Sequence, residues 1–439
     1  MVLDDGLHPS TRMRIDHVLA VPGRGGFFHD DAKAIAAGAQ QEGFSYLGEP
    51  TTPGHRKIRQ AGEALSVLLV LSDGQVAHGD CAAVQYSGVG GRDPIFSAAD
   101  ARQAVTGAVA SLITGSPVDT FRELATEVDS LQTNGTPLHT AVRYGVTQAL
   151  LHATALNRHH TMAEVVRDDY DTGVDLRPVP MFVQSGDDRR GAVDKMILKR
   201  ADVLPHGLIN EVSTKLGHDG GLFLAYVTWV RDRILALRDD ETYTPTLHFD
   251  VYGTIGVAFA DDPDRIVSYL EQVEAAARPF LVRVEQPVDA GSTPEQIGAM
   301  ATLRQRLSFR GSRLQLVVDE WCNTLEDIRL FTAAGAADII HVKTPDLGSV
   351  TNTIEALLHV QQAGLGAYCG GTCNETDRSA QVSAHLAMAC GAIQVLAKPG
   401  MGVDEGLMIV GNEMARTAAL AASRSTHPDP DPDPRGGAT

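Results

Sequence analysis

Eight short apolar runs, the first beginning at residue 180, constrain the fold of this chain more than any other feature. In chain order they are PMFVQSG, ADVLPHGLIN, TLHFDVYG, FLVRVEQP, LQLVVDEW, ADIIHVKTP, LGAYCGG and AIQVLAKPG. Nearly every gap between them holds a helical pattern, for example DPDRIVSYLEQVEAAA or TLEDIRLFTAAG. Runs that are apolar on both faces and alternate with amphipathic helices indicate parallel strands joined by βα crossovers.

The number of these units favours one architecture. Eight of them predict an α/β fold in which a (β/α)8 barrel of the TIM type closes on itself, rather than an open doubly wound sheet. No G-x-G-x-x-G motif follows the first run, which argues against a dinucleotide-binding domain.

The part of the chain before the barrel has a different pattern. Residues 11–90 alternate short strand-like runs with turns, and ALSVLLVLSDGQVAHGDCAAVQYSG indicates a hairpin around an SDG turn. Residues 97–160 are helical in period, and strands followed by helices indicate a separate α+β unit. We therefore predict an N-terminal α+β domain at 1–165, a barrel domain at 166–424, and a disordered Pro- and Asp-rich tail at 425–439.

Charge and cysteine content exclude several classes of function. A formal net charge of −18 argues against nucleic acid and anionic membranes as partners, although a small anionic substrate fits a locally positive site. The five cysteines include Cys369 and Cys373 at a spacing that could indicate a metal pair, but no second pair accompanies them at zinc-finger spacing. With no signal-peptide pattern and no membrane-length apolar run, we expect a reduced, cytoplasmic protein.

Four of the apolar runs end in a residue that can do chemistry. Asp250, Glu285 and Asp319 end the third, fourth and fifth runs, and Lys343 ends the sixth. In a barrel the carboxyl ends of the strands meet at one mouth, where active sites lie. Any one of these acids alone would more often be a solvated or capping residue. Three carboxylates at matched positions repel one another, which favours a bound divalent cation, Mg²⁺ before Mn²⁺ or Ca²⁺.

Two further side chains are candidates for proton transfer. Lys343 is expected to lose part of its preference for charge near a dication and so to act as a base, unless it is a surface or salt-bridged lysine. His206, in the second run, faces the mouth from the opposite wall, and its ordinary pKa suits proton transfer, unless it is a structural histidine. A dication between two bases suits abstraction of a proton next to a carboxylate, because the cation stabilises the resulting enolate.

Several longer motifs resemble one family. They are HFDVYGTIG, VEQPVDAGS, VVDEW, VKTPDLG, GGTCNETD and AKPGMGVDEG. Over nearly the whole chain except the tail, the sequence is similar to the methylaspartate ammonia-lyase family of the enolase superfamily. The resemblance implies an N-terminal domain that caps the barrel. It also implies reversible anti elimination of ammonia from the amino-dicarboxylate (2S,3S)-3-methylaspartate, giving mesaconate through an enolate, with K⁺ as a monovalent activator and a homodimer as the assembly.

The resemblance also implies roles for individual residues. Mg²⁺ would bind Asp250, Glu285 and Asp319, Lys343 would remove the C3 proton, and His206 would serve the C3 epimer. The residues implied to contact substrate or line its pocket are Gln85, Gln184, His341, Thr372, Cys373 and Leu396. A Gly-rich turn such as the one before Cys373 can present backbone N–H groups to an anion, and nothing in this chemistry requires a thiolate.

One position departs from the family pattern. The family usually has a glutamine two residues before the lysine, where this chain has His341. Both side chains can donate a hydrogen bond, but histidine titrates and has a different reach, which bears on substrate range and pH profile. Two alternatives stay open from the sequence: another proton-abstracting enzyme of the superfamily, such as a racemase, an epimerase or an acid dehydratase, and a non-catalytic binding paralogue.

Overall fold

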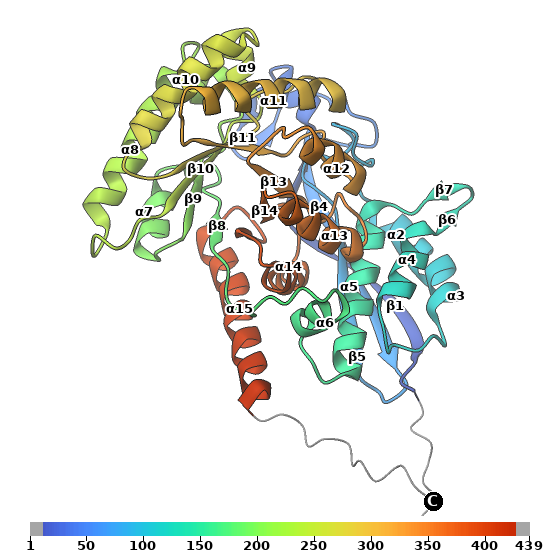
Figure 1. The fold of residues 1–439 in the computed structure, drawn as a ribbon. Helices are drawn as coiled ribbons and strands as arrows, with labels where there is room; N and C mark the ends of the chain where they lie inside the picture. Colours follow the sequence, from blue (N-terminus) through green and yellow to red (C-terminus); the bar gives the residue numbers. More distant parts are fainter. Residues whose placement is uncertain (1–11, 427–439) are drawn as a thin grey trace, which may run out of the picture.

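The computed structural model describes residues 12–426, and the part of the predicted tail after residue 426 lies outside them. The predicted barrel is confirmed: eight strands, every neighbouring pair parallel, close into one barrel (Figure 1). Each strand lies in one of the eight apolar runs, and they are β8 (Met181–Val183), β9 (Val203–His206), β10 (Thr246–Asp250), β11 (Val282–Glu285), β12 (Gln315–Val318), β13 (Ile339–Val342), β14 (Gly366–Cys369) and β15 (Gln394–Ala397).

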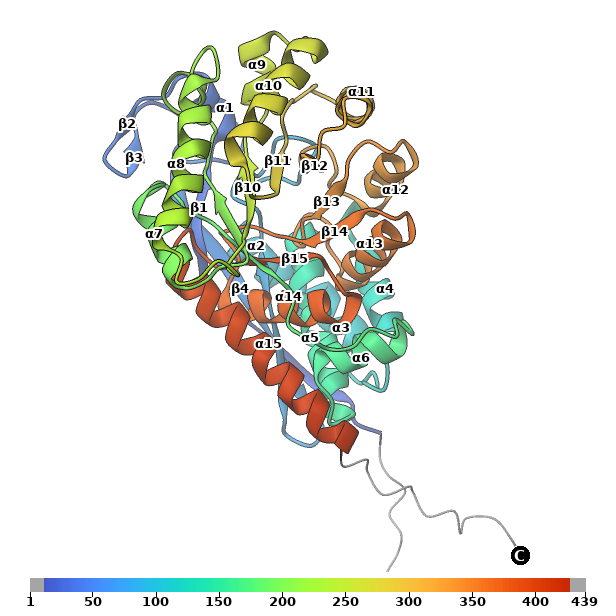
Figure 2. The same cartoon turned by 60° about the vertical axis from the view of Figure 1, so that its left-hand side comes forward.

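Helices between the strands surround the barrel, and α15 runs along its side (Figure 2). They are α7 (Gly191–Leu198), η2 (Val212–Leu216), α8 (Gly221–Leu237), α9 (Thr254–Phe259), α10 (Pro263–Ala277), α11 (Thr293–Phe309), α12 (Leu325–Ala333), α13 (Val350–Gln362), α14 (Asp377–Cys390) and α15 (Val403–Thr426). Local sequence sets several of their ends. Thr324 and Thr376 form capping boxes at the starts of α12 and α14, and Gly391 ends α14 in the left-handed conformation.

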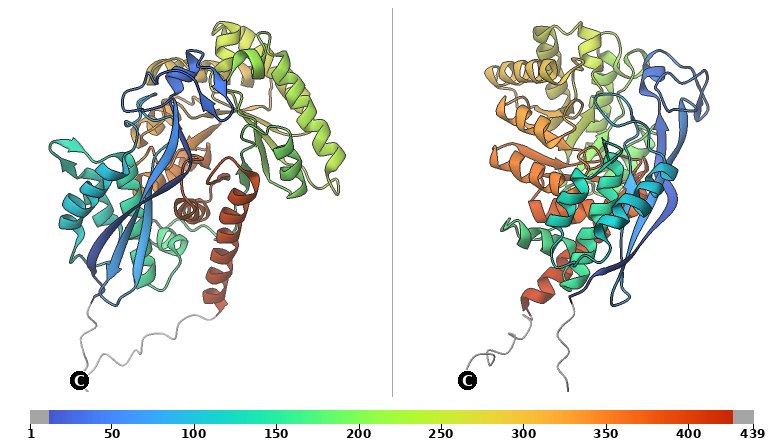
Figure 3. Two further views of the ribbon diagram at one scale, coloured as in Figure 1. Left: turned by 180° about the vertical axis from the view of Figure 1, so that it is seen from behind. Right: turned by 90° about the vertical axis from the view of Figure 1, so that its right-hand side faces the viewer.

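The N-terminal domain contains a three-stranded antiparallel sheet in the order β1 (Ile15–Asp30), β4 (Arg59–Leu71) and β5 (Val76–Ala82). The predicted SDG hairpin joins β4 to β5. Helix α5 (Thr140–Asn157) packs against this sheet, which lies on one side of the molecule (Figure 3). The remaining elements are α1 (Ala32–Ala36), β2 (Gln41–Glu42), β3 (Ser45–Tyr46), α2 (Ala98–Ala104), η1 (Val105–Val109), α3 (Ala110–Ile113), α4 (Arg122–Ser130), β6 (Gln132–Thr133), β7 (Thr136–Pro137) and α6 (Met162–Asp169).

Strand β1 differs from the expectation of short strands at the start of the chain. It continues through the GRGG segment, with an irregularity between Arg24 and Phe28. The glycines allow a close approach to the barrel rather than a turn, because the Gly26 N–H donates to the carbonyls of Asn374 and Glu375 at 3.2 and 2.9 Å. A side chain at Gly25 or Gly26 would clash with this segment. The first strand of the cap is therefore seated on a barrel loop.

The sequence predicted neither a membrane-spanning segment nor a metal site at Cys369 and Cys373. Among residues 12–426 no helix is both long enough and apolar enough to cross a membrane. All five cysteines of the sequence fall within these residues, and each is buried and outside any disulfide. Cys369 and Cys373 join no cluster of metal-ligating side chains within the part of the chain that the structure describes.

Candidate active site

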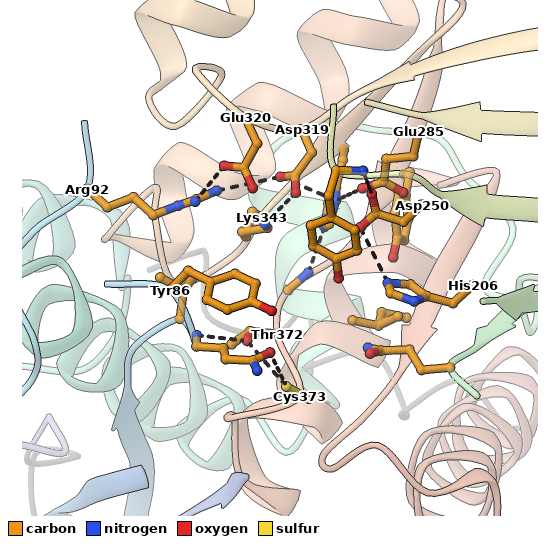
Figure 4. Close-up of a pocket in the computed structure, with 18 residues that line it drawn as sticks. Tyr86, Arg92, His206, Asp250, Glu285, Asp319, Glu320, Lys343, Thr372 and Cys373 are labelled. Atoms are coloured by element: carbon orange, nitrogen blue, oxygen red, sulfur yellow. Dashed lines mark hydrogen bonds and ion pairs between the residues drawn. The ribbon is translucent and has the colours of Figure 1, made fainter. Parts of the chain in front are cut away.

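All of the residues that the sequence predicted for the site line one cavity at the carboxyl ends of the barrel strands (Figure 4). They are Gln85, Gln184, His206, Asp250, Glu285, Asp319, His341, Lys343, Thr372, Cys373 and Leu396. Gln85 comes from the N-terminal domain, three residues after the end of β5, and the other ten come from the barrel. The structure therefore brings together side chains that are far apart in the sequence, and their roles in chemistry stay predictions.

The three acids come from adjacent strands and are all buried. Asp250 and Glu285 end β10 and β11 and are paired in register, and Asp319 follows β12 directly. Burial, and after it the charge of Glu285, raises the pKa of Asp250 to about 6. The pKa of Glu285 is instead lowered by the neighbouring His341 and His248, and that of Asp319 by Lys343 and His341, each against the effect of burial. A divalent cation would relieve the repulsion between these acids, and their oxygen donors fit a hard ion.

Histidines lie beside the acids as well. The carboxylates of Glu285 and Asp319 and a ring nitrogen of His341 lie within 4.8 Å of one another, which is the spacing of a metal site. This cluster contains two of the three predicted ligands, and His341 takes the place of Asp250 in it. Asp250 instead lies 3.5 Å from Nε2 of His206. The backbone N–H of Leu208 lies 3.3 Å from Nδ1 of His206.

Lys343 follows β13 and forms an ion pair with Asp319, at 2.6 Å between Nζ and Oδ2. Burial alone would lower the pKa of Lys343, but Asp319 and further acids outweigh it, so the net shift is upward. The fall in the pKa of Lys343 expected from the sequence refers to a site that holds a divalent cation, whose charge would offset that of these carboxylates, and it stays a prediction. Lys343 and His206 approach the cavity from opposite sides (Figure 4).

The amide of Gln85 is held in one orientation by the cap. Its Nε2 donates to Asp30 at 2.8 Å, and Arg59 holds the same carboxylate through two hydrogen bonds, of 2.8 and 2.7 Å. Since an ionised carboxylate only accepts, the carbonyl oxygen of Gln85 must face the cavity side, where it lies 3.3 Å from the sulfur of Cys373. Burial raises the pKa of that thiol to about 12, which agrees with a neutral Cys373.

The turn after β14 is supported from below by a buried ion pair. Lys398 donates to Glu375 at 2.6 Å and to the carbonyl of Gly370 at 2.8 Å. Glu375 in turn accepts from the backbone N–H of Thr372 at 2.9 Å. Gly371 has a φ of +139°, and a side chain there would clash with Glu375 and Lys398. The shape of the turn that carries Thr372 and Cys373 is thus determined by residues behind it.

Five further residues with polar side chains line the cavity and were not predicted: Tyr86, Arg92, Tyr252, Glu320 and Tyr368. Tyr86 and Glu320 directly follow predicted site residues, and this adjacency is the only signal they leave in the sequence. Arg92 reaches the cavity from the cap and leaves none. Its side chain is 3% exposed and pairs with Glu320 and with Asp346, the second at 2.7 Å.

Burial of acids and a lysine costs stability, and groups of this kind gather at functional sites. Their place at the mouth of a capped barrel defines this chain as an α/β-barrel enzyme with a carboxylate-rich site. Sequence models of the methylaspartate ammonia-lyase N-terminus and C-terminus match residues 13–171 and 173–423. The chain belongs to the methylaspartate ammonia-lyase family.

Individual relatives agree with this assignment. The methylaspartate ammonia-lyase of Clostridium tetanomorphum is 54% identical over 94% of this chain and 100% of its own length. The magnesium complex of β-methylaspartase from that organism has a TM-score of 0.90, with 94% of this chain and 100% of that chain covered. The Citrobacter amalonaticus enzyme containing (2S,3S)-3-methylaspartic acid has a TM-score of 0.92 at 49% identity, with coverages of 93% and 100%.

A more distant likeness concerns the fold alone. Muconate lactonizing enzyme from Pseudomonas fluorescens is 17% identical with a TM-score of 0.57, over 86% of this chain and 85% of that chain. The capped barrel is therefore shared well beyond the family.

Proposed function

We propose that this protein is a carbon–nitrogen lyase that eliminates ammonia reversibly from (2S,3S)-3-methylaspartate to give mesaconate, with Mg²⁺ as its metal. The observation that carries the proposal is the single cavity in which all of the predicted site residues meet. Family membership and the Citrobacter amalonaticus structure with (2S,3S)-3-methylaspartic acid support the choice of substrate.

In the proposed reaction Lys343 takes the proton from C3 of the substrate. The electrons of the C3–H bond pass into the carboxylate attached to C3, which gives the enolate. They then form the double bond between C2 and C3 as the C2–N bond breaks and ammonia leaves from the opposite face. The ion pair between Lys343 and Asp319, at 2.6 Å, keeps the amine at the wall of the cavity. Lys343 has to be neutral when it accepts the proton. A cation bound to Asp319 would offset the charge of that carboxylate, lower the pKa of Lys343 and so favour the reaction.

We assign the metal to Asp250, Glu285 and Asp319, whose oxygen donors suit Mg²⁺. A bound Mg²⁺ would stabilise the negative charge that develops on a substrate carboxylate during proton abstraction. The magnesium complex of the Clostridium tetanomorphum relative supports this choice of ion. We also propose K⁺ as a monovalent activator, which the family resemblance implies.

The remaining predicted residues hold the substrate in this proposal. The oriented carbonyl of Gln85 suits the amino group, and Gln184 lines the barrel wall. Thr372 and Cys373 lie in the turn after β14. The N–H of Thr372 already donates to Glu375, so the backbone N–H of Cys373 is the one we assign to a substrate carboxylate. Leu396 offers an apolar contact.

His206 faces Lys343 across the cavity and would serve the C3 epimer. His341 lies beside Glu285, with 2.8 Å between its Nδ1 and the carboxylate. We further propose that the protein is a homodimer and that it lies in the cytoplasm. Light scattering on the purified protein measures the number of chains in the assembly.

One experiment tests the central proposal. Purified protein is mixed with (2S,3S)-3-methylaspartate, Mg²⁺ and K⁺, and the absorbance of the conjugated product is followed with time. We expect a steady rise, and no rise with or without K⁺ would exclude the lyase. A racemase or an epimerase would instead change optical rotation without an unsaturated product, and a non-catalytic paralogue would change neither signal.

A further inference from the structure

Two histidines hold the carboxylate of Glu285 from different sides. Nε2 of His248, on β10, lies 2.8 Å from Oε2, and Nδ1 of His341, on β13, lies 2.8 Å from Oε1. All three side chains are buried, and His248 is fully enclosed in the barrel. Since an ionised carboxylate only accepts, each histidine has to present a proton to make its bond.

The proton of His248 is placed by a chain of hydrogen bonds along the barrel interior. Arg283 can only donate, and it does so to Oε1 of Gln394. The amide nitrogen of Gln394 therefore faces Nδ1 of His248, at 3.1 Å, and donates to it. With Nδ1 as acceptor, the neutral ring carries its proton on Nε2, the atom that faces Glu285.

The proton of His341 is placed by the backbone. The N–H of Gly371 donates to Nε2 of His341 at 3.1 Å. A neutral ring that accepts at Nε2 carries its proton on Nδ1, which faces Glu285. Nδ1 is the nitrogen of His341 that lies near Glu285 and Asp319. Because it carries this proton, it has no free lone pair with which to bind a metal there.

We propose that His248 and His341 are a pair of positioning residues that hold Glu285 in the orientation needed to bind Mg²⁺, and that His341 is neither a metal ligand nor a base. This inference rests on the magnesium site of the proposed function. Each oxygen of a carboxylate has two lone pairs, so a hydrogen bond to each leaves both able to bind a cation. Partners that orient a ligand in this way typically change metal affinity by about 10- to 100-fold.

The first test measures Mg²⁺ binding calorimetrically, without substrate. In His248→Phe the ring can keep its stack on Phe182, 4.2 Å between centroids, but loses both hydrogen bonds. We expect affinity to fall by about 10- to 100-fold in this variant. In His248→Gln the amide nitrogen can still donate to Glu285, and we expect most of the affinity to return.

The two failures are distinguishable. Wild-type affinity in His248→Phe would overturn the positioning role alone. If the wild-type protein binds no Mg²⁺, both the magnesium site and the positioning role are overturned.

The same comparison applies to His341. His341→Phe keeps an aromatic ring against Tyr368, whereas His341→Asn keeps a donor near the position of Nδ1. We expect weaker Mg²⁺ binding in the first and recovery in the second. Equal affinity in the two variants would overturn the proposal for His341.

A second test reads the ring protons directly in the wild-type protein and needs the variants only to assign its signals. Nitrogen NMR of the wild-type protein with ¹⁵N-labelled histidine distinguishes a ring protonated on Nε2 from one protonated on Nδ1. We expect His248 to be the first kind and His341 the second, with assignments from the signals that the variants lose. The reverse assignment, or two rings of one kind, would overturn the proposal, because packing alone does not require opposite tautomers.

Discussion

The cavity has two walls of different construction. On the barrel wall, consecutive strands each deliver one short side chain at the same level, so that Asp250, Glu285 and Asp319 meet without any special loop. On the cap wall, Gln85 and Arg92 come from the segment after β5, which has no regular secondary structure. They are positioned by acids rather than by a strand end: Asp30 holds Gln85, and Glu320 and Asp346 hold Arg92.

The difference separates two tasks. A strand end positions a side chain through the backbone, which suits groups that must keep a fixed place in the chemistry. A loop held by ion pairs positions a side chain through contacts that depend on charge, which suits recognition of a charged substrate. We therefore expect loss of the three acids or of Lys343 to stop the reaction, and changes to the cap wall to destabilise the contact between cap and barrel.

Removal of the metal should have the largest effect on turnover, because the proposed reaction depends on the cation held by the barrel acids. Treatment with EDTA is expected to stop turnover of 3-methylaspartate completely, and added Mg²⁺ should restore it. The measurement is the rate of product absorbance before chelation, after it, and after Mg²⁺ is returned. Turnover that survived full chelation would contradict the metal assignment.

Loss of the proposed base comes next. Lys343→Ala should reduce kcat for the (2S,3S) substrate by about 10²–10⁴-fold, the range for a general base, while circular dichroism shows an unchanged fold. The control is Lys199→Ala, which removes an exposed lysine paired with Asp404 and should leave kcat unchanged. Activity retained in Lys343→Ala would exclude Lys343 as the base.

The cap wall is tested through its buried arginine. Arg92→Met removes the partner of Glu320 and Asp346, and uncompensated buried charges of this kind destabilise a protein by about 3–5 kcal/mol. Denaturant unfolding of the two proteins measures the difference. The matched control is Arg177→Met, which breaks an exposed pair with Asp175 and should change stability by less than about 1 kcal/mol. Equal losses in both variants would show that Arg92 does not anchor the cap.

The smallest effect on the natural substrate is expected for His206. His206→Ala should slow the 3R epimer by about 10²–10⁴-fold and the (2S,3S) isomer by less than about tenfold. Steady-state kinetics on the two isomers, side by side, provide the measurement. If both isomers lose activity to the same degree, His206 has a role other than that of a second base.

The barrel and its acids were predictable from the sequence for a physical reason. Buried parallel strands require continuous apolar runs, so a charged residue at the end of a run, such as Asp250 or Lys343, is conspicuous. The course of β1 was not predictable in the same way. Its GRGG segment has the composition of a turn, and only the close approach of Asn374 explains why the strand continues.

The contribution of the cap to the site could not be predicted from the sequence, for a related reason. Arg92 lies in a segment without hydrophobic period, and its function depends on Asp346, which is more than 250 residues away in the chain. Of the two histidines on Glu285, His341 was singled out from the sequence, whereas His248 was not, because it lies inside an apolar run, where a polar residue usually indicates a structural role. The pKa of Lys343 depends on the sum of several carboxylates around one amine, and a run of apolar residues that ends in a lysine does not indicate that sum.

The seating of β1 on the loop after β14 has a consequence for protein engineering. Gly26 donates to the carbonyls of Asn374 and Glu375, and the side chain of Asn374 donates back to the cap through the carbonyl of Ala83 at 3.1 Å. Glu375 also accepts from Tyr144 of α5 at 2.8 Å. Cap and barrel thus share one joint, and a chimera that imports the cap of another family member has to import residues 370–376 with it.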